Sequence, residues 1–306
     1  MSSSRWLLLA AVVFTFLAWA SAFVVIRGVG PFLDGGPLAL GRLVVGAVAL
    51  GILALAARRW VWPTRREWVQ LVVYGVAWFG AYNVALNTAE QTLDAGTAAM
   101  IVGIGPILIA LGAGLFLGEG IPRWLAIGAA VAFAGVVLIG LGTLLAAGTA
   151  HPFDLVGAVL ALVAAITYAV GVITQKPVVR RIPAIQATFL GCVIGLVVCL
   201  PFAPLLVAQL AVAPASAWWG TVYLGVVPTA LAFTTWAYAL SRMPAGQLGI
   251  ASYLSPPLAT VMGFLAFQEI PHPLALAGGV VCLVGVALSR RRPVVREVLA
   301  NPVAPD

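Results

Sequence analysis

The side chains with binding chemistry in this chain are aromatic rings and carboxamides that interrupt long apolar runs. Trp78, Tyr82 and Asn83 lie in one such run, and Trp19 lies in another. An indole or phenol offers a flat apolar face and one polar atom, whereas a carboxamide both donates and accepts hydrogen bonds. These groups are suited to binding a small aromatic or amphipathic molecule by stacking and a few hydrogen bonds.

The second half of the chain carries a similar set of residues. Tyr168 corresponds to Trp19 at a spacing of 149 residues, and Trp236 and Tyr253 also lie inside apolar runs. For each of these rings the alternative role is packing against neighbouring helices or lipid, and for Asn83 it is a hydrogen bond between helices. The predicted substrate-binding residues are Trp19, Trp78, Tyr82, Asn83, Tyr168, Trp236 and Tyr253.

Charged and helix-breaking residues form a second set of candidates, with a gating or structural role. Arg42 lies about five residues inside its run, where it attracts anions at the rim of a cavity, forms a latch with Asp34, Glu90 or Asp94, or extends to the membrane surface. Pro106 and Pro256 remove backbone hydrogen bonds and are expected to bend their helices. Glu119 and Glu269 close their apolar runs and are predicted to make end-of-helix contacts that stabilise one state of a gate.

Several other chemistries lack the residues that they need. The three cysteines stand apart in apolar runs and the two histidines stand alone beside prolines, so we expect neither a metal site nor a cofactor. No GxxxxGK[ST] loop is present to bind the phosphates of ATP. An enzyme would need clustered His, Asp or Glu, and these clusters are missing. The chemistry of this chain is therefore predicted to be binding without catalysis.

The composition places these residues in a lipid bilayer. Hydrophobic residues make up 63% of the chain and charged residues only 8%, against about 25% in soluble proteins. A helix needs about 20 apolar residues to span a bilayer, and a helix satisfies its own backbone groups there. We expect an all-α integral membrane protein with ten transmembrane helices, at about 6–27, 37–57, 68–89, 95–117, 122–144, 154–175, 185–207, 217–240, 246–268 and 271–289.

The chain also contains an internal duplication. The pattern of Ala95-Gly96, Pro106, Glu119, Gly128 and Gly135 recurs 150 residues later as Ala245-Gly246, Pro256, Glu269, Gly278 and Gly285. The predicted units are a first five-helix repeat at 1–148, a second at 149–292 and a cytoplasmic tail at 293–306.

The basic residues predict the orientation of these repeats. With the N terminus in the cytoplasm, fourteen of the sixteen Lys and Arg residues fall on the cytoplasmic side. The net charge of +7 is then explained by basic residues that keep the cytoplasmic loops inside, and we expect no nucleic-acid partner. Because five spans is an odd number, the two repeats cross the membrane in opposite senses. Inverted repeats of this kind are a recurring architecture of secondary transporters, with the substrate site between the halves.

The same residues carry a family resemblance. The Trp19-Ala-Ser-Ala-Phe23 run with Arg27, the Gly41-Arg42 pair, the Asn83 to Asn87 segment and the duplicated pattern resemble the EamA type of the drug/metabolite transporter superfamily. This resemblance covers residues from about 8 to 290. It implies a ten-helix exporter with both termini in the cytoplasm and a central cavity. The exporters of this superfamily include aromatic amino-acid exporters.

We therefore predict a secondary transporter of the bacterial inner membrane that exports small metabolites by alternating access. Amino acids, aromatic or otherwise amphipathic, are the leading substrates; drugs or other metabolites are the alternative, and a channel is less favoured. No Asp or Glu lies in the middle of a run, so export either follows the substrate gradient or is coupled through boundary carboxylates such as Glu90. The glycine-rich spans are expected to pack within one chain, which predicts a monomer in the bilayer.

Overall fold

The computed structural model describes residues 3–92, 101–147, 155–267, 272–289 and 291. Within these ranges every regular element is a helix, so the all-α expectation is confirmed there. In chain order the α-helices are α1 (Ser3–Val29), α2 (Gly35–Ala57), α3 (Arg65–Tyr74), α4 (Tyr82–Thr92), α6 (Gly105–Phe116), α7 (Arg123–Ala147), α8 (Leu155–Val178), α9 (Ala184–Cys199), α10 (Ala203–Val212), α11 (Ala215–Leu224), α12 (Ala232–Leu240), α13 (Ala245–Ala251), α14 (Ser255–Phe267) and α15 (Pro273–Ser289).

Several of these helices join into longer apolar rods. In the described residues, eight rods are long and apolar enough to cross a membrane, and two shorter apolar helices, Gly105–Phe116 and Pro273–Ser289, occupy the places of the fourth and tenth expected spans. We number all ten as rods, by the expected span that each one occupies, so the two shorter helices are the fourth and tenth rods. Large apolar side chains cover the outside of the bundle; Val212, for example, is 87% exposed. An outward-facing apolar surface of this extent belongs in lipid, and the chain is a multi-pass membrane protein.

The third and eighth rods share an unusual feature. A π-helical segment, Gly75–Ala81, joins α3 to α4, and a second one, Gly225–Leu231, joins α11 to α12. The two segments lie 150 residues apart, and each has seven residues. A π-helical turn adds one residue to the turn and shifts the faces of the helix that follows. The faces of α4 and α12 are therefore set by these insertions.

The fourth and ninth rods are interrupted just before their prolines. A turn at 103–104 precedes α6, and a 3₁₀ turn, Ser252–Leu254, separates α13 from α14. Pro106 and Pro256 each lie in the first turn of the helix that follows, where the missing N–H of a proline costs nothing. The expected bend is thus a break in which the proline begins a new helix.

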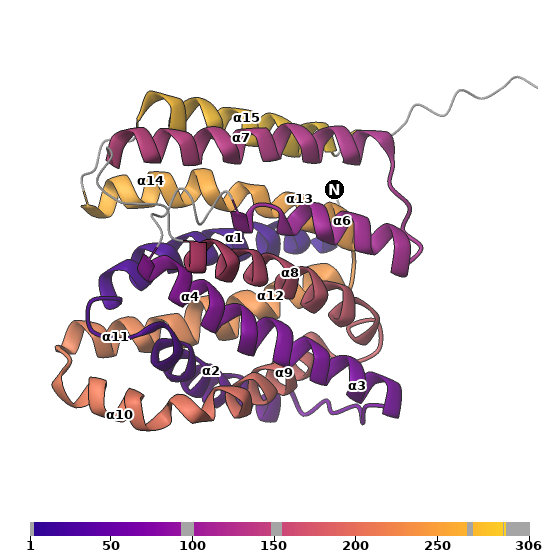
Figure 1. Cartoon of the computed structure of the whole chain (residues 1–306). Helices are drawn as coiled ribbons and strands as arrows, with labels where there is room; N and C mark the ends of the chain where they lie inside the picture. The colour runs from indigo at the N-terminus through magenta and orange to yellow at the C-terminus, as the bar shows by residue number, and fades with distance from the viewer. Residues whose placement is uncertain (1–2, 93–100, 148–154, 268–271, 290, 292–306) are drawn as a thin grey trace, which may run out of the picture.

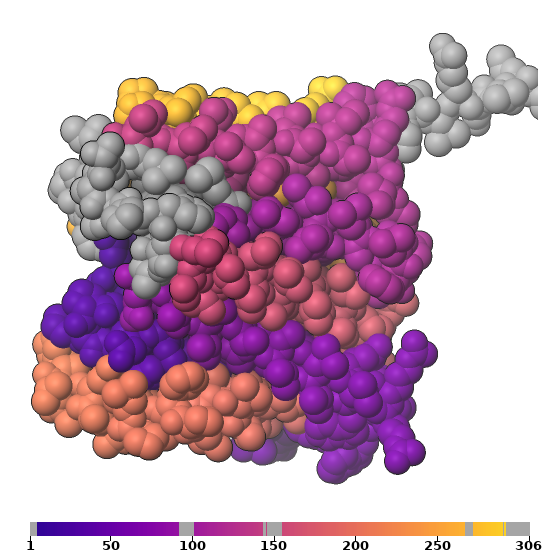
Figure 2. All heavy atoms as spheres, viewed as in Figure 1, coloured from indigo at the N-terminus to yellow at the C-terminus, as the bar shows by residue number. Residues whose placement is uncertain are grey.

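The helices pack into a bundle with distinct edges. In Figure 1, α7 and α15 lie side by side along one edge, and α2, α9 and α10 lie toward the opposite one. The space-filling view in Figure 2 shows the same separation, with the orange surface around α10 on the side away from α7 and α15. The main core lies between these edges and includes α1, α8, α9 and α12. We call the end at which α1 begins the proximal end, and the end at which it finishes the distal end.

Close approach of α7 and α15 depends on glycine. A Cβ on Gly128 would lie 2.6 Å from the Gly285 carbonyl oxygen, and a Cβ on Gly135 would lie 2.7 Å from that of Gly278. Gly128 is equivalent to Gly278 in the duplication and Gly135 to Gly285, so the two contacts pair the four glycines crosswise between the halves. The duplicated glycines therefore meet each other across the helix pair.

Candidate functional site

The centre of the bundle holds a cluster of aromatic rings. Trp78 is its hub: its ring centroid lies 5.0 Å from that of Tyr168, 5.5 Å from that of Trp236 and 6.0 Å from that of Trp19. Most neighbouring pairs meet edge to face or at a tilt, the geometries that aromatic pairs prefer. The aromatic cluster consists of Phe16, Trp19, Tyr74, Trp78, Phe79, Tyr82, Tyr168, Phe233 and Trp236.

The polar atoms of the cluster are unevenly satisfied. Trp19 Nε1 donates to the Pro228 carbonyl at 3.2 Å. Trp236 Nε1 and the Tyr168 hydroxyl are buried and have no hydrogen-bond partner in the described structure. A buried donor without a partner costs about 1–3 kcal/mol. The cluster therefore holds two buried hydrogen-bonding groups that are unsatisfied in the described structure.

Small residues let the helices bring these rings together. Trp78 is 1% exposed and lies in the Gly75–Ala81 π-helical segment. A Cβ on Gly171 of α8 would lie 2.6 Å from the Trp78 Cβ, so α8 can approach this closely only without a side chain there. The amide group of Asn83 bonds within its own rod: its Nδ2 donates to the carbonyls of Trp78 at 3.1 Å and of Phe79 at 3.0 Å. It thereby satisfies carbonyl groups of the π-helical segment.

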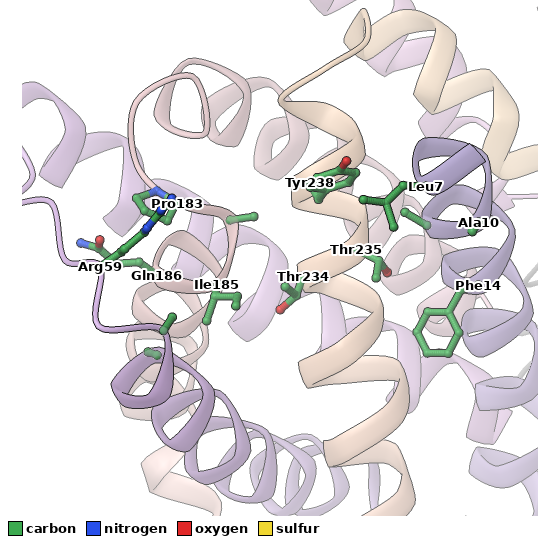
Figure 3. A pocket seen from close by; sticks show the side chains of 14 residues that line it. Leu7, Ala10, Phe14, Arg59, Pro183, Ile185, Gln186, Thr234, Thr235 and Tyr238 are labelled. Atoms are coloured by element: carbon green, nitrogen blue, oxygen red, sulfur yellow. The ribbon is translucent and has the colours of Figure 1, made fainter. Parts of the chain in front are cut away.

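A cavity of about 580 Å³ opens at the proximal end of the bundle, between α1, α2, α9 and α12. Figure 3 shows Thr234, Thr235 and Tyr238 of α12 between Leu7 and Phe14 of α1 on one side and Ile185 of α9 on the other. The lining is mostly apolar.

The cavity ends close to the aromatic cluster. Thr15 Oγ1 and Thr235 Oγ1 are 2.8 Å apart and join α1 to α12. The residues that follow them, Phe16 and Trp236, belong to the aromatic cluster. Thr235, which lines the cavity, thus directly precedes a residue of the aromatic cluster.

The distal half contains buried charge. Arg42, in the second turn of α2, is 5% exposed, and its Nε donates to Thr229 Oγ1 at 3.1 Å. Its guanidinium group is thus buried in the bundle and does not extend to the surface. On α4, Glu90 Oε1 and Asn87 Oδ1 are buried without a partner in the described structure, while Asn87 Nδ2 donates to the Gly35 carbonyl at 3.3 Å.

At the proximal end, two charged side chains hold the loop between α12 and α13. The Glu119 carboxylate accepts hydrogen bonds from the backbone N–H groups of Ala245 at 2.9 Å and Gly246 at 3.1 Å. Lys176 Nζ donates to the carbonyls of Leu240 and Met243, both at 2.6 Å. A carboxylate at a helix N-terminus and an ammonium at a helix C-terminus both complement the helix dipole. Nearby, Glu67 pairs with Arg181, and this hydrogen bond raises the pKa of the Arg181 guanidinium.

The structure thus brings five of the seven predicted binding residues into one cluster: Trp19, Trp78, Tyr82, Tyr168 and Trp236. Tyr253 lies elsewhere, and its hydroxyl donates to the Gly103 carbonyl at 2.6 Å, across the breaks of the fourth and ninth rods. Glu269 lies outside the described residues.

Sequence reasoning missed several residues of the site. Phe16, Phe79 and Phe233 have no polar atom that would distinguish them from lipid-facing phenylalanines. Thr229 carried a usable signal, because it is a hydroxyl beside Pro228 in the middle of a span.

Comparisons with known proteins agree with this architecture. The model of the EamA-like transporter family matches twice, at residues 4–141 and 155–291. A protein of Streptantibioticus cattleyicolor named a probable terminal-alkyne amino-acid exporter is 37% identical, over 94% of this chain and 94% of that protein. The threonine/homoserine exporter RhtA of Salmonella typhimurium is 30% identical, over 92% of this chain and 96% of its own.

A solved crystal structure has a similar fold, with a TM-score of 0.74 at 20% identity, and it covers 92% of this chain and 98% of its own. The duplicated helical architecture and both family matches lead to one identification: this chain belongs to the EamA-like transporter family.

Proposed function

We propose that this protein exports amino acids with apolar or unsaturated side chains across the bacterial inner membrane, by alternating access between two inverted five-helix repeats. The aromatic cluster carries this proposal. It lies in the middle of the spans, it takes rings from both halves of the chain, and it contains the unpartnered Trp236 Nε1 and Tyr168 hydroxyl. Aromatic rings bind apolar side chains over a large area, and a few polar groups then fix the orientation of the ligand.

Three observations support the inverted repeats. The family model matches each half separately. The π-helical segments lie 150 residues apart. The glycine contacts between α7 and α15 are reciprocal: Gly128 meets Gly285, and Gly135 meets Gly278. Ten spans follow if the short helices α6 and α15 cross the membrane with the eight longer rods.

The relatives favour amino acids as substrates. The matches include a probable exporter of a terminal-alkyne amino acid and an exporter of threonine and homoserine. Hydrophobic cationic drugs fit the aromatic cluster less well, because none of its rings carries a negative charge. A channel is disfavoured because the rings at the centre of the bundle pack against one another and leave Trp78 and Trp236 almost fully buried.

The proposal is tested with the full chain in proteoliposomes. Labelled L-phenylalanine, L-tryptophan, L-threonine and an alkyne-bearing amino acid are offered, with and without a pH gradient. We expect uptake of the apolar amino acids down their own gradients, and we expect Trp78→Ala to reduce it at least tenfold because the hub of the cluster is lost. Absence of transport for all four would contradict the proposed function.

The matched control is Trp219→Ala. Trp219 is 72% exposed on the lipid side of α11, so its loss leaves the aromatic cluster unchanged. Both variants are first compared by thermal unfolding in detergent. Equal flux in Trp78→Ala and Trp219→Ala would show that the aromatic cluster does not take part in substrate transport.

A further inference from the structure

Two ionisable groups of opposite type lie in the distal half of the bundle beside the aromatic cluster: Arg42 is 5% exposed, and Glu90 has one buried carboxyl oxygen, Oε1. Arg42 lies on α2 and Glu90 on α4, and these two helices meet where Asn87 Nδ2 of α4 donates to the Gly35 carbonyl of α2 at 3.3 Å. Buried ions are costly in a protein interior unless they are paired and hydrogen-bonded. The partners of these two groups therefore need an explanation.

The two side chains do not pair with each other. No ion pair joins them, and in the described structure the one hydrogen bond of Arg42 runs from Nε to Thr229 Oγ1 at 3.1 Å. The terminal guanidinium nitrogens are left for another acceptor. Glu90 Oε1 is buried without a partner, and so is Asn87 Oδ1 one turn earlier on α4. The guanidinium group on α2 and the two acceptors on α4 thus form no hydrogen bond with one another in the described structure.

Neither charge is part of the duplicated framework. The positions that correspond to Arg42 and Glu90 in the second half are Gly191 and Leu240, 149 and 150 residues later. By contrast, the π-helical segments and the glycine contacts of α7 and α15 occur in both halves. A charge pair needed for the helical framework would be expected in both repeats. A pair that binds an asymmetric ligand is needed only once.

The charges are continuous with the aromatic cluster. The ring centroid of Tyr82 lies 5.9 Å from that of Tyr168, which in turn lies 5.0 Å from that of Trp78. A ligand with a positive and a negative group at one end and an apolar group at the other would satisfy both regions together.

We propose that Arg42 binds the α-carboxylate and Glu90 the α-ammonium of a zwitterionic amino acid, with Asn87 Oδ1 as a second acceptor for the ammonium and the aromatic cluster around the side chain. This inference rests on the proposed export of amino acids and names the part of the site that recognises them as a class. A guanidinium is suited to a carboxylate because it can donate two parallel hydrogen bonds.

The test measures binding to the full chain in detergent. Three probes share one side chain: L-phenylalanine carries both charges, phenethylamine lacks the carboxylate, and 3-phenylpropionate lacks the ammonium. We expect the wild type to bind L-phenylalanine at least tenfold more tightly than either analogue. Arg42→Gln should weaken L-phenylalanine binding at least tenfold and leave phenethylamine unaffected, whereas Glu90→Gln should remove the preference over 3-phenylpropionate.

Controls separate this result from general damage. Arg66→Gln changes an exposed arginine of α3 and should bind all three probes as the wild type does. If a glutamine variant fails to fold, Arg42→Lys and Glu90→Asp retain the charges and should keep the preference for L-phenylalanine, with lower affinity.

Three further results would contradict either the zwitterion site or the proposed function. If the wild type transports L-phenylalanine but binds both analogues equally well, the zwitterion site is wrong and the proposed function stands. If folded Arg42→Gln and Glu90→Gln keep the selectivity of the wild type, the same conclusion follows. If no amino acid is bound or transported by the wild type, the proposed function fails and this inference fails with it.

Discussion

At the scale of single residues, Glu119 gives a physical reason for part of the duplicated sequence pattern. Its carboxylate accepts two hydrogen bonds from Ala245 and Gly246, the first residues of α13. The Ala-Gly pair and the Glu that recur along the chain are thus joined across the two halves at the proximal end. Such a contact can hold that end in one state and release it in another.

We expect Glu119→Gln to destabilise this state. Hydrogen bonds to a charged group contribute about 1.5–3 kcal/mol and those to a neutral group about 0.5–1.5 kcal/mol; glutamine keeps one acceptor where the carboxylate offers two, so the loss should be about 2–4 kcal/mol. Glu119→Ala should cost more, because it removes both acceptors. Thermal unfolding can be followed with a thiol-reactive dye, since Cys192, Cys199 and Cys282 are all buried. An unchanged midpoint for Glu119→Ala would show that the contact is not formed in the membrane protein.

Residue types determined how much of the site could be predicted. Trp78 and Trp236 stood out because a large ring with a polar atom is unusual in the middle of a span, and both lie in the cluster. Asn83 stood out because an amide is also unusual there, yet in the structure its amide group donates hydrogen bonds to carbonyls of its own rod. Which face of the helix a polar residue occupies depends on the π-helical turn before it, and the sequence pattern does not reveal that turn.

At the scale of elements, the π-helical segments position the aromatic cluster. Trp78 lies within the first segment, and Phe233 and Trp236 follow the second. Each segment begins with a glycine that touches a neighbouring helix: a Cβ on Gly75 would lie 2.8 Å from the Gly191 carbonyl oxygen, and a Cβ on Gly225 would lie 2.8 Å from that of Arg42.

Gly75→Ala and Gly225→Ala should therefore each destabilise the protein. The added methyl group would meet backbone atoms that cannot move independently, and overpacking of this kind costs about 1–3 kcal/mol. Gly263→Ala is the matched control, because nothing lies within 4 Å of its added Cβ. We expect that variant to be unchanged or slightly more stable, as alanine favours helix over glycine. Similar unfolding midpoints for all three variants would contradict the close packing.

The spans themselves could be predicted because lipid requires long apolar runs. The run at 37–57 corresponds to α2, Gly35–Ala57, and the run at 185–207 to a rod that continues to Val212. The breaks before Pro106 and Pro256 could not be predicted in this form. A proline inside an apolar run is compatible with a kink and with a new helix start, and packing decides between them.

At the scale of the whole molecule, the two ends of the bundle differ. The proximal end carries the cavity and the contacts of Glu119 and Lys176. The distal half carries the buried Arg42 and the buried Oε1 atom of Glu90. A transporter that is built from repeats but moves an asymmetric ligand needs such a difference, since the repeats supply the motion and the unrepeated residues supply recognition.

The predicted orientation assigns the proximal end to the cytoplasm, and cysteine accessibility can test it. Arg59 at the proximal end and Gly28 at the distal end are both exposed, and nothing lies within 4 Å of a Cβ added to Gly28. The three native cysteines are buried and should give little background. A membrane-impermeant maleimide should label Gly28→Cys in intact bacterial cells and Arg59→Cys only after the inner membrane is permeabilised. The reverse pattern would invert the orientation, and with it the direction in which the cavity and the zwitterion site face, because the two ends of the bundle carry different chemistry.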